Sequence, residues 1–219
     1  MYVGLKMLKR GQFPTVTAET PIARADKLML QNRLWMLLVV DEGRLVGRVN
    51  KEEVKAALPS AATDLSRHEI NTLLARLKVG SIMRKDVPCV LPETEIEEAA
   101  RLMYDDDLPG LAVVDRNNAL LGFINRNVML DILVEEMGLK QGGSRIVFEV
   151  EDRSGVMHEV SGIIASFGIS IIATGTFFHN NRRIVVVRVQ TEDPGQIIKA
   201  LSEKGYTMVG PDTFAGEWS

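Results

Sequence analysis

Apolar and polar positions follow the same order twice in the first two thirds of the chain. Each round begins with a short apolar stretch, continues with apolar residues at helix spacing, and then shows two apolar runs joined by a turn. A second helix is expected after each pair of runs. The pattern therefore predicts two copies of a β-α-β-β-α unit. The first helices should face a core with Ile22, Ala25, Leu28 and Met29 in the first copy and Ile96, Ala99, Leu102 and Met103 in the second.

The two copies align residue by residue, with one extra residue in the turn of the second. Pro14 aligns with Pro88, and Asn50 aligns with Asn125. Such self-similarity indicates that one structural unit was used twice.

Several helix starts carry capping signals. We expect Thr20 to cap the first helix of the first copy, and Thr94 with Glu97 to form a capping box in the second. Between the copies, Ser66 and Glu69 form another capping-box pattern, which predicts a connecting helix.

The pattern changes in the last third, after the Gly-containing stretch 139–144. A strand is expected at 145–151, then a helix that ends at Gly168, a strand hairpin that turns at 179–181, a helix that opens at Asp193, and a short last strand. This β-α-β-β-α-β order is the ferredoxin-like arrangement. The fold class is therefore α+β. The chain should divide into a first copy with its N-terminal segment (1–60), a connecting helix (61–80), a second copy (81–138), a linker (139–144), a ferredoxin-like domain (145–210) and a tail without a strong element (211–219).

Composition supports a soluble globular chain. Apolar residues make up 46% and charged residues 25%, and no apolar run is long enough for a membrane helix. The N-terminus lacks a signal-peptide pattern, so we expect a cytoplasmic protein without a membrane partner. A formal charge of −3 with interspersed signs argues against a nucleic-acid partner. Cys89 lies in an apolar stretch and is expected to be buried.

Residues suited to catalysis do not form a recognisable set. His68, His158 and His179 have no Cys or carboxylate at metal spacing, and no nucleophile–base pair appears. The run Asp105, Asp106 and Asp107 should fan out at a helix end as solvated acids, because consecutive residues rarely form one octahedral site. We therefore expect no catalytic residue and no metal, and an enzyme is the least favoured function.

The starts of the two closing helices suit an anion. Asn50 and Asn125 stand where unpaired N–H groups and positive partial charge favour a phosphate. Lys51 and Arg126 follow directly and could reach it, and Glu53 is placed to accept hydrogen bonds from ribose hydroxyls.

These motifs resemble those of known families. The repeated segments LLVVDEGRLVGRVNKEEV and AVVDRNNALLGFINRNVM resemble the CBS domain, two of which form a Bateman module. The segment EDRSGVMHEV resembles the opening of an ACT domain, with Gly155 kept and Ser154 in place of Pro. A CBS pair followed by an ACT domain is similar to the acetoin-utilisation family of regulatory proteins.

The resemblance implies a non-enzymatic sensor with no obligatory cofactor. CBS pairs bind adenine nucleotides such as AMP, ADP or ATP between their two units, and ACT domains bind amino acids or dimerise. A homodimer that acts on an unknown protein partner is therefore expected. The implied nucleotide-binding residues are Thr15, Val16, Thr17, Leu38, Val39, Arg48, Asn50, Lys51, Glu53, Pro88, Cys89, Val90, Val113, Asn125 and Arg126. The implied amino-acid site is Asp152, Ser154, Gly155 and Val156.

Departures from the family pattern separate the two copies. Both Thr positions of the CBS motif are Asn, and its Asp is Glu53 in the first copy but Val128 in the second. Valine cannot bind ribose hydroxyls, so the first copy is favoured. Arg33 is a further candidate ligand, and Trp35 could stack on a base or pack in a core. Two other functions stay open: an interaction module with empty CBS sites, and an amino-acid sensor that acts through the ACT domain alone.

Overall fold

The computed structural model describes residues 1–59 and 76–217. The chain divides into two compact units, residues 1–130 and 131–219. The capping box expected at Ser66 and Glu69 lies outside the described residues. Within the described ranges, no helix is long and apolar enough to cross a membrane.

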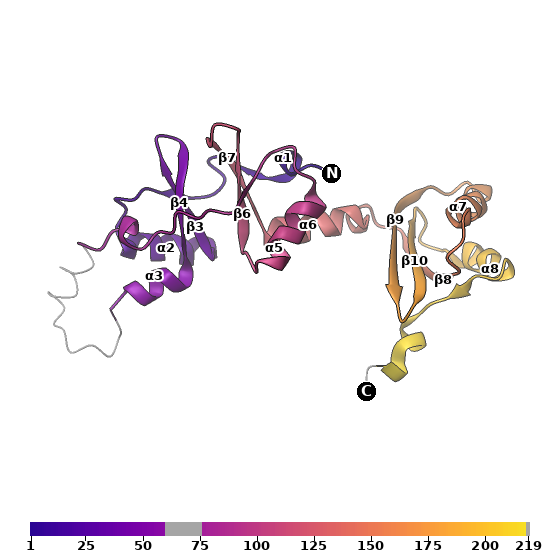
Figure 1. Cartoon of the computed structure of the whole chain (residues 1–219). Helices are drawn as coiled ribbons and strands as arrows, with labels where there is room; N and C mark the ends of the chain where they lie inside the picture. Colours follow the sequence, from indigo (N-terminus) through magenta and orange to yellow (C-terminus); the bar gives the residue numbers. More distant parts are fainter. Residues whose placement is uncertain (60–75, 218–219) are drawn as a thin grey trace. The chain divides into compact units, whose positions relative to one another are not determined.

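The first unit contains both copies of the predicted β-α-β-β-α unit (Figure 1). The first copy consists of β2 (Thr15–Val16), α2 (Ile22–Asn32), β3 (Met36–Asp41), β4 (Arg44–Asn50) and α3 (Lys51–Ala57). The second consists of β5 (Cys89–Val90), α5 (Ile96–Asp105), β6 (Gly110–Val114), β7 (Leu120–Asn125) and α6 (Arg126–Glu136), which continues into the second unit. In each copy a parallel strand pair is followed by an antiparallel hairpin.

The core of the first unit has separate layers. The predicted helix faces are confirmed, because Ile22, Ala25 and Met29 are fully buried beneath α2 and their counterparts are buried beneath α5. The opposite faces of the two sheets pack on each other, with Leu38 of the first copy and Ala112 of the second in one apolar cluster. The central strands β3 and β6 are therefore covered on both faces.

The two copies exchange edge segments. The N-terminal strand β1 (Leu8–Lys9), which follows the short helix α1 (Val3–Lys6), pairs with β7 of the second copy. In return, Arg84, just after the 3-10 turn η1 (Val79–Ser81), forms an antiparallel bridge with Arg48 of the first copy. A Cβ at Gly122 would lie 2.6 Å from the carbonyl oxygen of Leu8, so this close approach requires glycine.

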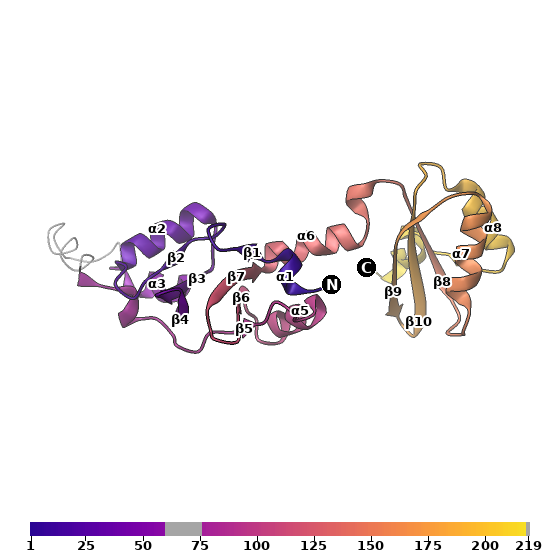
Figure 2. The ribbon, with the colours of Figure 1, turned by 90° about the horizontal axis from the view of Figure 1, so that it is seen from above.

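The second unit confirms the ferredoxin-like prediction. Its antiparallel sheet has the order β11-β8-β10-β9, and α7 and α8 cover one face of it (Figure 2). Asn180 and Asn181 make the hairpin turn with left-handed backbones, as their side chains allow. The elements are η2 (Leu139–Gln141), β8 (Ser144–Val150), α7 (Val156–Ser166), β9 (Ile171–His179), β10 (Arg182–Val189), α8 (Gly195–Glu203), β11 (Thr207–Met208) and η3 (Pro211–Glu217).

Two predicted helix caps are wrong. Helix α2 begins at Ile22 with Pro21 at its N-cap, and Thr20 instead accepts a hydrogen bond from the Thr17 N–H at 3.0 Å. In the second copy Thr94 likewise accepts from the Leu91 N–H at 3.2 Å. In both copies the threonine hydroxyl therefore accepts a backbone N–H of the turn before the helix, and not an N–H of the helix itself.

Two other expectations are also wrong. Cys89 is exposed, because in the two-residue strand β5 only the alternate residue, Val90, faces the core. The segment expected to be a featureless tail contains the 3-10 turn η3, whose Phe214 ring lies 4.8 Å from that of His179.

Candidate functional site

A cleft of about 550 Å³ opens within the first unit, where both copies contribute to its walls. This volume lies in the range of small-molecule sites. Many of its residues occupy equivalent positions of the repeat. It is lined by Arg33, Leu34, Trp35, Met36, Asn50 and Glu52 of the first copy and by Asp107, Pro109, Phe123, Asn125, Arg126 and Asn127 of the second.

Both asparagines predicted at the helix starts line this cleft and cap their helices. Asn125 Oδ1 accepts the N–H of Val128 at 3.0 Å at the start of α6. Asn50 forms a capping box at the start of α3, where Glu53 Oε2 accepts the Asn50 N–H at 2.8 Å. The predicted caps are confirmed, and they bring the two asparagines to one cavity.

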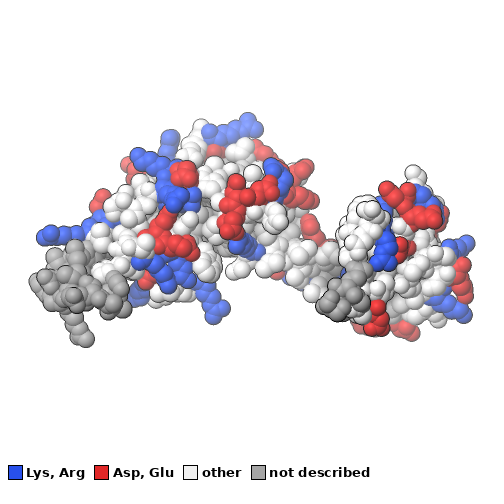
Figure 3. Space-filling model, turned by 60° about the horizontal axis from the view of Figure 1, so that its bottom comes forward, with Lys and Arg blue, Asp and Glu red and all other residues white. Residues whose placement is uncertain are grey.

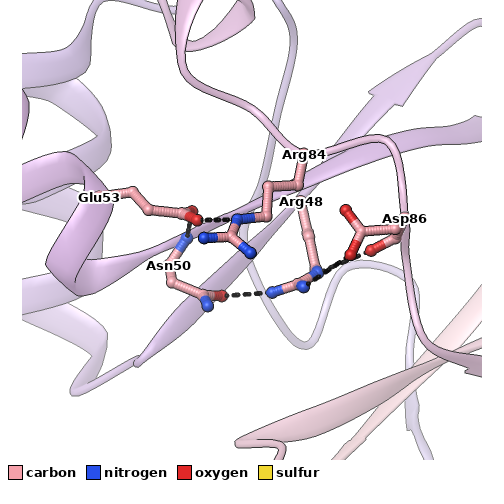
Figure 4. Close-up of polar contacts among 5 residues, drawn as sticks. All are labelled: Arg48, Asn50, Glu53, Arg84 and Asp86. Carbon is pink, nitrogen blue, oxygen red and sulfur yellow. Dashed lines mark hydrogen bonds and ion pairs between the residues drawn. The ribbon is translucent and has the colours of Figure 1, made fainter.

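Glu53 and Arg48 are engaged by the protein itself (Figure 4). Glu53 Oε1 accepts a hydrogen bond from Arg84, so both of its carboxylate oxygens have partners. Arg48 is only 7% exposed and donates from Nε to the carbonyl oxygen of Asp86 at 2.8 Å. Its two other nitrogens donate to Asp86 Oδ2 and Asn50 Oδ1, both at 3.2 Å. Arg48 therefore holds the segment that contains Arg84 and Asp86 against β4, and it orients the Asn50 side chain.

The pKa of the Asp86 carboxyl group is lowered by its hydrogen bonds. A hydrogen bond with its own backbone, and then the Arg48 guanidinium, hold the pKa of Asp86 below its usual value. Asp86 stays ionised at neutral pH, which keeps its pairing with Arg48 in place.

Charges in the cleft differ between its two halves. Arg126 pairs with the carboxylate of Asp107 and donates from Nε to the Leu108 carbonyl at 3.1 Å. Arg33 occupies the position equivalent to Asp107 and has no ion pair among the described residues. Lys51 is equivalent to Arg126 but does not line the cleft; its Nζ lies 4.5 Å from the centre of the Trp35 ring, which does.

Trp35 lies at the cleft and not in the core. The residue is 58% exposed, so the expectation that it packs in a core is wrong, and stacking on a base stays a prediction. The backbone N–H of Lys51 donates to the Trp35 carbonyl at 2.9 Å, so the start of α3 is fastened to the residue that precedes β3.

Most of the apolar residues expected to contact a base lie in the core. Each of their side chains is buried, and none of them lines the cleft. These residues are Val16, Leu38, Val39, Val90 and Val113. Thr15, Thr17, Pro88 and Cys89 are also absent from its lining; Thr17 contacts Thr20 through the two hydroxyl oxygens at 3.2 Å.

Several cleft residues were not predicted. The missed residues are Leu34, Met36, Glu52, Asp107, Pro109, Phe123 and Asn127. The repeat alignment could have identified some of them, because Trp35 and Pro109 occupy equivalent positions of the two copies, as do Glu52 and Asn127. A site built by two copies of one unit draws on the same positions of both.

The four ACT-type residues lie together in the second unit. Asp152, Ser154, Gly155 and Val156 border a hollow of about 510 Å³. Gly155 has φ +89°, a conformation that disfavours other residues. Arg183 donates to Asp152 Oδ1 at 2.6 Å and so fixes one side of this turn.

A carboxylate near this turn is held by two donors. Arg153 donates to both oxygens of Glu159, at 2.8 and 2.7 Å, and the Tyr206 hydroxyl donates to Oε2 at 2.8 Å. Arg153 and then Tyr206 lower the pKa of Glu159 to about 2. Burial, and then the hydrogen bond to Glu159, raise the pKa of Tyr206.

Ionisable residues elsewhere do not gather into a metal site. Over residues 1–59 and 76–217, no group of three or more His, Cys, Asp or Glu is placed to hold a metal ion. Asp105 pairs with Arg101 at 2.8 Å, and His68 lies outside the described residues. Figure 3 shows basic and acidic side chains interspersed over the visible face of each unit.

Comparison with known families decides what the repeat is. The CBS-domain model matches residues 6–60 and 79–135, and the ACT-domain model matches residues 144–205. The chain belongs to the CBS-domain family. It is a tandem CBS pair followed by an ACT domain, and it is 29% identical over 136 residues to a CBS domain-containing protein of Dictyostelium discoideum. That match covers 62% of this chain and 94% of the relative.

Solved structures share the fold of the CBS pair. CBSX2 of Arabidopsis thaliana, in complex with AMP, is 25% identical with a TM-score of 0.51, over 61% of this chain and 96% of that one. A Vibrio cholerae protein named for acetoin utilization is 21% identical with a TM-score of 0.54, over 66% of this chain and 98% of that one. Two other relatives, an inosine-5'-monophosphate dehydrogenase of Methanocaldococcus jannaschii and a magnesium transporter of Thermus thermophilus, are longer, and this chain spans about a fifth of each.

Proposed function

We propose that this CBS/ACT chain is a non-enzymatic regulator that senses an adenine nucleotide. The observation that carries the proposal is the cleft between the two CBS units, which collects cations, two capping asparagines and an exposed aromatic ring. The AMP bound by CBSX2, a structure with the same fold, supports an adenine nucleotide as the ligand.

The phosphate end of the nucleotide would lie against polar groups of this cleft. Asn125 and Arg126 begin α6, an eleven-residue helix whose first N–H groups favour an anion. Asn50 and Lys51 supply the equivalent groups of the first copy. Glu53 could accept ribose hydroxyls only after releasing Arg84, because both of its oxygens have partners.

The ACT domain would support dimerisation or hold an amino acid. Its turn at Asp152–Val156 borders an open hollow with Arg183 beside it, which suits a small zwitterion. The Vibrio cholerae protein of the same CBS fold suggests acetoin utilisation as the regulated process, through a protein partner that the nucleotide would control.

The second candidate is an interaction module whose CBS sites stay empty. Two observations favour it: Glu53 is fully engaged, and Asp107 neutralises Arg126. This alternative predicts binding to a protein partner and no response to any nucleotide.

Thermal unfolding with added nucleotides separates the two candidates. A ligand at 100 times its Kd should stabilise the chain by about 2.7 kcal/mol. We expect AMP, ADP or ATP to stabilise the wild-type chain. Arg126→Ala should weaken that response, because it leaves the Asp107 carboxylate unpaired in the cleft, where it would repel a phosphate. Asn117→Ala, in the exposed turn before β7, is the matched control and should respond like wild type. No stabilisation by any of the three nucleotides would refute the sensor and support the empty module.

A further inference from the structure

The two halves of the CBS cleft are not equivalent in charge. In the second copy Arg126 faces Asp107, so the pair contributes no net charge. In the first copy the lining contains one cation, Arg33, and one acid, Glu52, and Lys51 adds a second cation beside the lining, over the Trp35 ring. Neither Arg33 nor Lys51 has an ion pair in the described part of the chain. The first-copy half is therefore net positive, and a phosphate would be attracted to it.

The same half carries an aromatic surface. Trp35 is 58% exposed, whereas the equivalent residue of the second copy is Pro109, which has no π face. The Lys51 ammonium lies over the indole at 4.5 Å. Exposed cation–π contacts are weak, so Lys51 can leave the ring at little cost. An uncovered indole face and an unpaired ammonium would then be available close to each other, one for the base and one for the phosphate of a nucleotide.

We propose that the nucleotide lies in the first-copy half of the cleft, with its base stacked on Trp35 and its phosphate bound by Arg33 and Lys51. The base takes the ring face that Lys51 covers in the free protein, and Lys51 turns to the phosphate. This inference rests on the proposed nucleotide-sensing function and adds the orientation of the ligand. Stacking accepts any base, so Trp35 supplies affinity and not discrimination between purines.

Fluorescence provides a direct test, because the chain has two tryptophans, Trp35 and Trp218. In a Trp218→Phe background the emission reports Trp35 alone. We expect AMP and adenosine to quench it by stacking, and ribose 5-phosphate, which lacks a base, not to quench it. By calorimetry, Trp35→Ala should lower AMP affinity roughly 10-fold, while Trp35→Phe keeps most of it.

The phosphate contact is tested with Arg33→Asn, because asparagine tolerates the left-handed backbone at this position, where φ is +53°. It should weaken AMP several-fold and leave adenosine unchanged. Arg24→Ala, at an exposed position of the same helix, is the matched control. If AMP binds by calorimetry but Trp35 emission and Trp35→Ala affinity stay at wild-type values, this orientation is refuted while nucleotide sensing stands. If AMP does not bind the wild-type chain, both proposals fail.

Discussion

Arg48 is predicted from the sequence to contact the nucleotide, and the structure adds a second role, as a clamp between β4 and the segment that contains Asp86. Arg48→Ala removes a charge-assisted hydrogen bond to the Asp86 carbonyl, and such bonds contribute about 1.5–3 kcal/mol. The ion pair with the Asp86 carboxylate, which is 74% exposed, adds at most about 1 kcal/mol. We therefore expect a loss of roughly 2–4 kcal/mol, which corresponds to a fall in Tm of roughly 5–15 °C.

Urea unfolding followed by circular dichroism measures this loss. Arg44→Ala, at the exposed start of the same strand, is the matched control and should change stability by less than about 0.5 kcal/mol. The clamp would be disproved by an Arg48→Ala protein that unfolds at the wild-type urea concentration yet is no longer stabilised by AMP. That result would make Arg48 a ligand residue.

Three further predictions concern the cleft and the ACT domain. Asp107→Asn frees Arg126 and should tighten AMP binding by up to about 5-fold in a calorimetric titration; weaker binding would contradict the charge argument. The lowered pKa of Glu159 means that its contribution to stability is complete above pH 4.5 and is lost as pH falls towards about 2; Glu159→Gln should remove this part of the pH dependence of urea midpoints. Gly155→Ala should destabilise the chain by about 1–2 kcal/mol, because φ is +89°, whereas Gly162→Ala inside α7 should stabilise it by about 0.5–1 kcal/mol; equal effects in urea unfolding would refute the backbone explanation.

The order of the helices and strands, and the faces of the helices that are buried, could be predicted from the sequence because they follow from local periodicity. The helix faces at Ile22 and Ile96, the caps at Asn50 and Asn125, and the hairpin of the ACT domain all depend on residues a few positions apart. The threonine caps failed because Thr20 and its counterpart found a nearer backbone donor than the helix start.

The exchange of edge segments depends on contacts distant in sequence, and periodicity does not reveal them. Leu8 pairs with Phe123, and Arg84 pairs with Arg48. This exchange also gives Arg48 a structural role that its local sequence does not reveal, since its partner Asp86 belongs to the segment that precedes the second copy. The cleft was found only in part, because its walls are set by how two copies pack on each other.

Central-strand residues were assigned to the ligand for a related reason. An apolar strand can face a base or a second sheet, and its sequence is the same in both cases. In this fold Leu38 faces the second copy and Val39 faces α2, so the cleft lies at the strand ends instead.

A crystal structure of the full chain grown with saturating AMP tests the central claim most directly. The account predicts electron density for one nucleotide in the cleft between the CBS units, with the base against Trp35 and the phosphate beside Arg33 and Lys51. An empty cleft at saturating AMP, or a nucleotide bound elsewhere on the chain, would contradict it.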